Sequence, residues 1–161
     1  MSGVRADYII TQESSCILYV HLQWYREDII EAFAVDPTVG SALQLWTGDP
    51  RDLALRIAEI LADTPASDTL VLDVHELSSV ADYFVICSGE NERQLRAISN
   101  DLLDTLGEQR VRPHRTEGSP QSGWIVLDYG DSIVHIFDVD QRAYYRLESL
   151  WSEAQTLVAM E

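Results

Sequence analysis

Two carboxylates, a histidine and a tryptophan lie close together in the stretch WIVLDYGDSIVHIF, which covers residues 124–137. Asp128 and Asp131 flank a short turn, and Trp124 and His135 lie on the apolar runs at either side of it. Carboxylates and a histidine beside an aromatic ring are the residue types of an enzyme site. An aromatic residue rimmed by acids is equally typical of a protein-binding surface.

The turn predicts how these side chains face one another. If Tyr129 and Gly130 form a two-residue hairpin loop, Asp128 faces Asp131. Because side chains alternate along a strand, one face then also carries Trp124, Val126, Ile133 and His135. Two facing carboxylates repel, and a metal, Arg142 of the same chain or a basic group of a partner would relieve the repulsion. An ordinary core face with Trp124 under a helix fits the local pattern as well.

The metal-binding residue types do not form a recognisable ligand set. The histidines are His21, His75, His114 and His135, with no pair at i,i+4 spacing, and the chain has no CxxC motif. The two cysteines, Cys16 and Cys87, are widely spaced, which argues against a disulfide framework. Cys87 lies in DYFVICSG, which predicts a buried strand with a free thiol. We therefore expect neither a metal nor another cofactor.

The SGEN stretch at Ser88 is a second candidate for chemistry. A Ser-Gly pair between a strand and a helix can bind phosphate with backbone N–H groups, and it resembles the Gly-Ser turn of nucleotidyltransferases. That chemistry needs two or three carboxylates that hold Mg²⁺ against a triphosphate. The chain after Ser88 instead predicts a helix that carries Asp101 and Asp104. A helix-capping turn is therefore the favoured interpretation.

The charge of the chain bears on its partners. Asp and Glu total 27 against 11 basic residues, all arginine, which gives a formal net charge of −16. Such a field repels phosphate backbones, so direct nucleic-acid binding is not expected as the main activity. A basic protein is a more natural partner, although acidity also serves solubility. The chain has no apolar run long enough for a membrane span and no secretory signal at its start, which predicts a cytoplasmic protein.

The elements around these residues predict an α/β fold. Asp49 and Pro50 start a helix, and strands are expected at 69–74 and 82–89. A helix over 91–106, a short extended piece and the hairpin follow. Residues 142–158 predict a last helix that buries Tyr144, Leu147, Trp151 and Ala154. The order α-β-β-α-β-β-β-α indicates a mixed β-sheet packed by helices over residues 49–161, preceded by an N-terminal extension at 1–48.

Several motifs in this order resemble the ribosomal silencing factor family, also called Iojap-like. They are Leu-Asp-Val, Ala-Asp-Tyr-Phe-Val-Ile, a Gly followed by Arg-Gln, Glu-Gly before Trp, Asp-Tyr-Gly-Asp, Val-His-Ile-Phe and Tyr-x-Leu-Glu-x-Leu-Trp. The resemblance covers about residues 52–154. It implies a nucleotidyltransferase-like fold without the catalytic acids, and a protein that is not an enzyme.

The resemblance also implies a function. Such a factor binds the fourteenth protein of the large ribosomal subunit, blocks joining of the subunits and represses translation when nutrients are limiting. Family members are commonly homodimers off the ribosome. The competing interpretation is a nucleotidyltransferase-like enzyme with a degenerate site.

Carried over by position, the family's docking surface implies a set of partner-binding residues. The matching positions are Trp124, Asp128, Tyr129, Asp131, His135, Phe137 and Tyr145. The aromatic residues at 124, 129 and 137 are the expected apolar anchors, partly exposed in the free protein. Gly130 and Gly118 are expected to serve turns. Arg142 and Glu148 are expected to be structural.

Overall fold

The computed structural model describes residues 48–161, which form one six-stranded mixed sheet. The strand order is β3-β4-β5-β2-β1-β6. Only the central β2–β5 pair is parallel, and all other neighbours are antiparallel. The bounds are β1 Ser67–Asp73, β2 Tyr83–Gly89, β3 Arg115–Ser119, β4 Trp124–Asp128, β5 Ser132–Asp138 and β6 Gln155–Met160. The predicted α/β class with a mixed sheet is confirmed.

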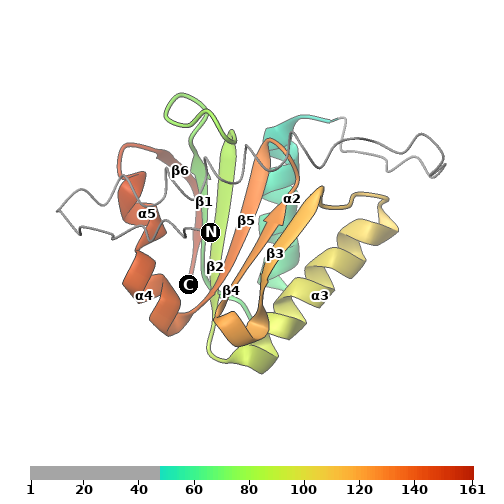
Figure 1. The fold of residues 1–161 in the computed structure, drawn as a ribbon. Helices are drawn as coiled ribbons and strands as arrows, with labels where there is room; N and C mark the ends of the chain where they lie inside the picture. The colour runs from blue at the N-terminus through green and yellow to red at the C-terminus, as the bar shows by residue number, and fades with distance from the viewer. Residues whose placement is uncertain (1–47) are drawn as a thin grey trace, which may run out of the picture. The chain divides into compact units, whose positions relative to one another are not determined.

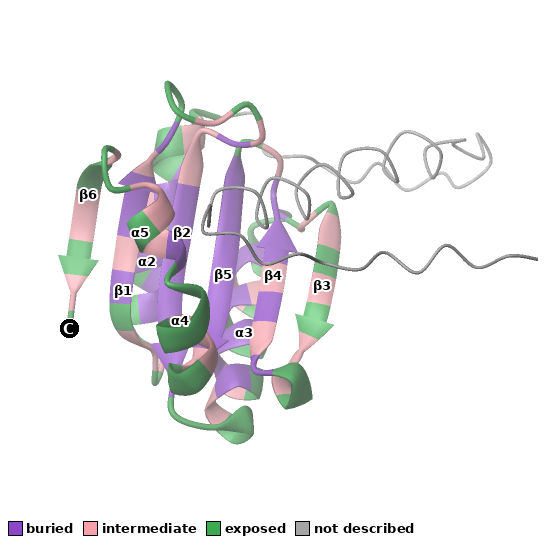
Figure 2. Ribbon diagram, turned by 60° about the vertical axis from the view of Figure 1, so that its left-hand side comes forward, coloured by how far each residue is buried: buried purple, intermediate pink, exposed green. Residues whose placement is uncertain are grey.

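Helices cover the two faces of the sheet unequally. The long helices α2 (Pro50–Ala62) and α3 (Glu92–Glu108) pack on one face, and the short helices α4 (Val139–Tyr145) and α5 (Leu147–Leu150) lie over the other (Figures 1 and 2). A single 3-10 turn, η1 (Pro120–Ser122), connects β3 to β4. Within 48–161 no helix is long and apolar enough to cross a membrane.

Local sequence signals fix the starts of the two long helices. The Asp49 side chain accepts a hydrogen bond from the Arg51 N–H at 2.9 Å, and Pro50 occupies the first helical turn. The Asn91 side chain accepts from the Gln94 N–H at 3.0 Å at the start of α3. Both caps satisfy backbone donors that the helix itself leaves unpaired. The predicted helix starts are confirmed.

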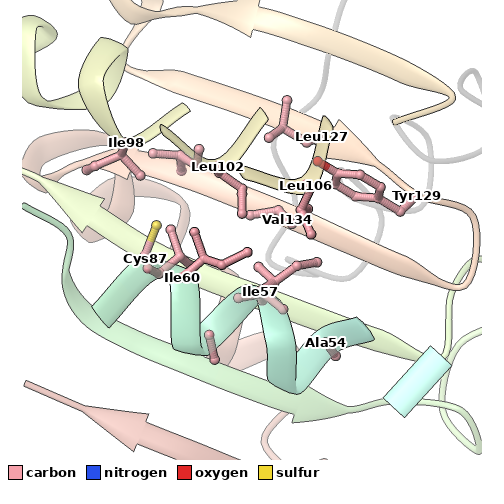
Figure 3. Packing of buried hydrophobic residues seen from close by; sticks show 14 of the residues in the cluster. Ala54, Ile57, Ile60, Cys87, Ile98, Leu102, Leu106, Leu127, Tyr129 and Val134 are labelled. Atoms are coloured by element: carbon pink, nitrogen blue, oxygen red, sulfur yellow. The ribbon is translucent and has the colours of Figure 1, made fainter. Parts of the chain in front are cut away.

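The hydrophobic core lies between the sheet and the α2–α3 layer. Figure 3 shows Ile57 and Ile60 of α2 and Leu102 and Leu106 of α3 directed at the strands. Cys87 of β2 lies in the same cluster and is buried, as predicted. Burial raises the pKa of its thiol to about 12, so Cys87 packs as a small apolar residue rather than acting as a nucleophile.

The end of the chain differs from the prediction of one helix over 142–158. Arg146 adopts a left-handed conformation, with φ 46°, and terminates α4. The short α5 follows, and residues 155–160 then pair with β1 as strand β6. The helical spacing of the apolar residues was misleading, because pairing with β1 outweighs local pattern there. Tyr144, predicted to be buried, is exposed, whereas Leu147 is buried as predicted.

The hairpin register also differs from the prediction. The Tyr129 N–H donates to the Ser132 carbonyl at 3.0 Å, so the loop residues are Gly130 and Asp131. Asp128 therefore pairs with Ile133 and not with Asp131. The predicted pairing was wrong by two residues along β5. A shift of two keeps the same side chains on the same face.

Gly118 provides a test of this architecture. It has φ +76°, and a Cβ there would collide with the Trp124 carbonyl oxygen of the neighbouring strand. Gly118→Ala should lower the free energy of unfolding by about 2 kcal/mol, since strain and backbone collision combine. In thermal melts this corresponds to a fall in melting temperature of roughly 5 °C.

Gly107→Ala is the matched control. Gly107 lies inside α3, and a Cβ there meets nothing closer than the Arg112 guanidinium at 4.0 Å. Alanine in a helix is better than glycine by about 0.5–1 kcal/mol, so this variant should melt at the same temperature or slightly higher. Equal melting temperatures for the two variants would contradict the β3–β4 geometry.

Candidate protein-docking site

Ring contacts run across the sheet face that α4 and α5 cover. Trp124 stacks on Phe137 with centroids 4.7 Å apart, and Tyr145 of α4 lies 4.8 Å from Trp124. His135 lies 5.9 Å from Trp124 and 5.3 Å from Phe84, and Phe84 in turn lies 5.5 Å from Trp151. We call these residues the aromatic face: Phe84, Trp124, His135, Phe137, Tyr145 and Trp151.

The accessible part of this region lies at α4. The helix has no buried residue. Tyr144 is 79% exposed, Val139 is 56% exposed and Tyr145 is 37% exposed, while Trp124 is half-buried. An exposed group of aromatic and aliphatic side chains beside a partly covered tryptophan is the composition of a protein-binding patch.

Two of the three expected anchors are not accessible. Tyr129 is 5% exposed and lies in the core cluster near Leu106 and Leu127 (Figure 3). Phe137 is fully buried under Trp124. The expectation of partial exposure is therefore wrong for both. Because side chains alternate along β4, residue 129 lies on the same face as residues 125 and 127 and on the opposite face from residue 124. The family resemblance suggested Tyr129 as an anchor without taking this alternation into account.

The predicted acids are separated. Asp128 is buried, and its Oδ1 accepts a hydrogen bond from the Gly130 N–H at 2.7 Å. Asp131 is exposed in the turn, where Gly130 adopts φ +90°. The facing pair of carboxylates does not form, so the repulsion that would call for a cation does not arise. No group of three or more potential metal ligands occurs within residues 48–161.

His135 is a buried, neutral member of the aromatic face. Burial lowers its pKa to about 3, and neither ring nitrogen has a hydrogen-bond partner in the described structure. An imidazole without an acidic or basic neighbour to exchange protons with is not arranged for general acid–base catalysis. It serves here as an aromatic packing residue.

Ser88 is held by an arginine. Its Oγ accepts a hydrogen bond from Arg142 Nη1 at 2.8 Å, and the residue is buried in β2. Asp101 and Asp104 are exposed on α3. The carboxylates of a nucleotidyltransferase are therefore not gathered at this turn. Arg142 and Glu148, expected to be structural, contact each other at 3.0 Å.

Sequence reasoning missed the two most exposed side chains of the patch, Tyr144 and Val139. The single long helix predicted for 142–158 placed Tyr144 on the inner face and left Val139 outside the element. Helix α4 starts at Val139 and ends at Tyr145. The predicted helix therefore started too late to include Val139, and it placed Tyr144 on the wrong face.

Comparisons with known proteins agree with one another. A family model described as ribosomal silencing factor during starvation matches residues 47–161. Ribosomal silencing factor RsfS of Bacillus subtilis (strain 168) is 41% identical over 101 residues, covering 62% of this chain and 86% of that protein. Protein Iojap-related, mitochondrial, of Arabidopsis thaliana is 38% identical over 148 residues, covering 89% of this chain and 80% of that protein.

Solved structures show the same likeness. A crystal structure from Chromobacterium violaceum superposes with a TM-score of 0.62 at 28% identity, covering 65% of this chain and 88% of that chain. One from Bacillus halodurans superposes with a TM-score of 0.58 at 35% identity, covering 67% of this chain and 98% of that chain.

The Arabidopsis match reaches into the N-terminal extension. Residues 47–161 make up less than three quarters of the chain, whereas this match covers 89% of it. Part of the segment before residue 47 therefore has a counterpart in that protein. The extension itself lies outside the described residues.

The buried imidazole of His135 predicts a pH dependence of stability. Its pKa is lowered to about 3 by burial in the folded state, and an unfolded histidine titrates near 6.5. Between these values the unfolded chain binds a proton that the folded chain excludes, so stability falls as pH falls from 6.5. Between pH 7.5 and 5 this group alone should remove about 2 kcal/mol from the free energy of unfolding.

His135→Phe should abolish that part of the pH dependence. Phenylalanine keeps an aromatic ring at a position where the nitrogens make no hydrogen bonds. Chemical denaturation of both proteins at several pH values measures the difference in their free energies of unfolding. The contributions of the carboxylates are the same in both proteins and cancel in this difference. Parallel stability curves for the two proteins would show that His135 is not buried as a neutral group.

Proposed function

Because the chain belongs to the ribosomal silencing factor family, we propose that it binds the large ribosomal subunit through that subunit's fourteenth protein and blocks subunit joining. By doing so it represses translation when nutrients are limiting. It acts in the cytoplasm, without a cofactor, and is a homodimer off the ribosome. Residues 49–161 carry this function, and residues 1–48 are a separate extension.

The observation that carries the proposal is the exposed aromatic group of α4 beside Trp124. Tyr144 and Tyr145 contact each other edge-to-face at 5.0 Å, and Tyr145 packs on Trp124 at 4.8 Å. The tyrosines are thus supported from one side and open on the other. A few residues supply most of the binding energy in protein interfaces, and tyrosine and tryptophan are enriched among them. In this chain they replace Tyr129 and Phe137 as the anchors.

Charge indicates the chemistry of the partner surface. The chain carries a net charge of −16, and Asp131 and Asp140 are exposed on the turn before β5 and on α4. Asp140 lies on the helix of the tyrosines, and Asp131 lies at the opposite, hairpin end of β5. Acids at the edges of a docking face favour a basic partner, because complementary potentials speed association and repel wrong partners. Asp128, which is buried, is a less suitable contact than Asp131 in this proposal.

The proposal includes no nucleotide transfer. The Ser88 hydroxyl is engaged by Arg142, and Asp101 and Asp104 lie on the exposed side of α3. Phosphoryl or nucleotidyl transfer depends on metal ions held by converging carboxylates. The arrangement around Ser88 supports a structural role for this turn.

Co-sedimentation with purified large ribosomal subunits tests the proposal directly. The protein should migrate with large subunits in a sucrose gradient. When small subunits are then added, the yield of joined ribosomes should fall as the protein concentration rises. Joining at full yield with the large subunits saturated by the protein would contradict it.

Tyr145→Ala should weaken binding to the isolated ribosomal protein. Loss of an aromatic anchor from an interface typically costs about 2 kcal/mol or more, which is roughly thirtyfold in affinity. The melting temperature should change by only a few degrees, about 3 °C or less, because α4 has no buried residue. Binding titrations and thermal melts measure the two effects.

Tyr129 supplies the control for Tyr145→Ala. Tyr129→Phe keeps the buried ring and removes a hydroxyl without a partner, so this variant should bind and melt as the unaltered protein does. Tyr129→Ala, by contrast, should destabilise the core by about 3 kcal/mol or more. Loss of binding by a fully folded Tyr129→Phe variant would show that the Tyr129 hydroxyl contributes to the interface.

Asp131→Lys should slow association with the ribosomal protein, chiefly at low salt. Reversal of an exposed acid at the rim changes long-range attraction, which is screened over about 8–10 Å at physiological ionic strength. Asp104→Lys makes the same charge change on α3, over the opposite face of the sheet. The rim role requires a larger loss of association rate for Asp131→Lys than for Asp104→Lys, and equal losses would reduce the effect to net charge.

A further inference from the structure

Helix α4 is held on the sheet without a hydrophobic face of its own. It spans seven residues, and none of them is buried. A helix this short does not persist by itself and depends on tertiary contacts. One of these contacts is the ring packing of Tyr145 on Trp124 at 4.8 Å. Another is made by Arg142, which lies in the middle of the helix.

Arg142 ties α4 to three separate parts of the fold. Its Nη1 donates to the Ser88 Oγ of β2 at 2.8 Å and to the Asp68 carbonyl oxygen of β1 at 2.6 Å. Its Nε donates to Glu148 Oε1 of α5 at 3.0 Å. The Arg142 side chain is only 11% exposed. The guanidinium therefore points into the protein, away from any partner that docks on the tyrosines.

The Asp68 end of this tie is a strained point of the backbone. Asp68 is a non-glycine residue with φ +48°, at the irregularity in β1–β2 pairing between Ser67 and Leu70. Such a conformation costs free energy and is retained only where surrounding contacts fix it. The hydrogen bond from Arg142 to the Asp68 carbonyl oxygen is one such contact.

We propose that Arg142 is the positioning residue of the docking patch: it clamps α4 to β1 and β2 and so presents Tyr144 and Tyr145 in the orientation that the partner binds. This inference rests on the proposed function, because it assigns a role to Arg142 through those tyrosines. Arg142 itself makes no contact with the partner.

The clamp requires the planar fork of an arginine. A guanidinium directs several N–H donors at fixed angles and stays charged, whereas a lysine ammonium is a single flexible point charge. Lysine at 142 can keep the ion pair with Glu148. It cannot at the same time reach the Ser88 hydroxyl and the Asp68 carbonyl in the observed geometry.

Arg142→Gln, Arg142→Lys and Ser88→Ala test the clamp at three strengths, with Arg93→Gln on the exposed side of α3 as the matched control. Amide hydrogen exchange should quicken in residues 139–150 for the first two variants and less for Ser88→Ala, while β2 and β5 keep their protection. Arg93→Gln should leave exchange unchanged. If Arg142→Gln does not fold, the milder Arg142→Lys and Ser88→Ala variants carry the comparison.

Binding supplies the measurement that a merely structural role would not move. Arg142→Gln should weaken binding to the isolated ribosomal protein by about tenfold, and Arg142→Lys should restore only part of the loss. In a Tyr145→Ala background the same Arg142→Gln change should weaken binding much less. That non-additivity is expected only if Arg142 acts through the tyrosine.

Three results would overturn the proposal that Arg142 positions α4. They are unchanged exchange in residues 139–150, full rescue by Arg142→Lys, and an equal loss of binding with and without Tyr145. Failure of the unaltered protein to bind large subunits would instead overturn the proposed function. The exchange measurement would then still decide whether Arg142 holds α4.

Discussion

The parallel pairing of β2 with β5 is the constraint on which the rest of this structure depends. It brings together two segments nearly fifty residues apart, with Tyr83 opposite Ser132 and Gly89 opposite Asp138. Both strands are buried along almost their whole length, as expected of parallel strands that are covered on two faces. The register also sets where the chain emerges after β5. Because α4 begins at Val139, directly beyond the end of β2, Arg142 comes within reach of Ser88.

Alternation along these central strands divides the chemistry of the protein between two layers. One set of side chains joins α2 and α3 in an aliphatic core that includes Tyr129. The other set contributes to the aromatic face. Within residues 48–161, buried polar atoms of Trp124, His135, Glu148 and Trp151 have no hydrogen-bond partner. Buried polar atoms without partners are costly. Their concentration on the face that carries the exposed tyrosines fits a surface adapted to more than stability.

The sequence predicted what local contacts decide and failed where distant pairing decides. The caps at Asp49 and Asn91 are local. The first helix start was predicted from Asp49 and Pro50, and the second was predicted at residue 91, after the SGEN turn. Strand β6 was missed, since its identity depends on pairing with β1, more than eighty residues earlier. The hairpin loop was displaced by one residue because a Tyr-Gly and a Gly-Asp loop are equally plausible from sequence, and only the Tyr129–Ser132 hydrogen bond distinguishes them.

The candidate site was predicted in composition more than in geometry. The aromatic residues at 124, 135, 137 and 145 do come together. Which of them reach solvent depends on depth in the sheet, which alternation alone does not give. Phe137 lies in a central strand under Trp124, whereas Tyr144 lies on a helix whose limits are set by the left-handed turn at Arg146. The exposure of Tyr144 depends on where α4 ends. Three-dimensional contacts decide that end, and the local sequence pattern does not.

The proposed docking patch lies on a helix without buried residues, which poses a physical problem that the surrounding contacts solve. Binding costs conformational entropy whenever the contact residues must first be ordered, so preorganised anchors bind more tightly than mobile ones. Helix α4 is not preorganised by a buried hydrophobic face, because none of its residues is buried. Polar contacts from one inward-pointing arginine, together with the ring of Tyr145 packed against Trp124, order the helix and leave its outer side free. The same arrangement explains why the charged side chain of Arg142 is only 11% exposed. An arginine among carbonyl, hydroxyl and carboxylate acceptors has its desolvation offset by hydrogen bonds, and it orders the helix without covering the exposed tyrosines.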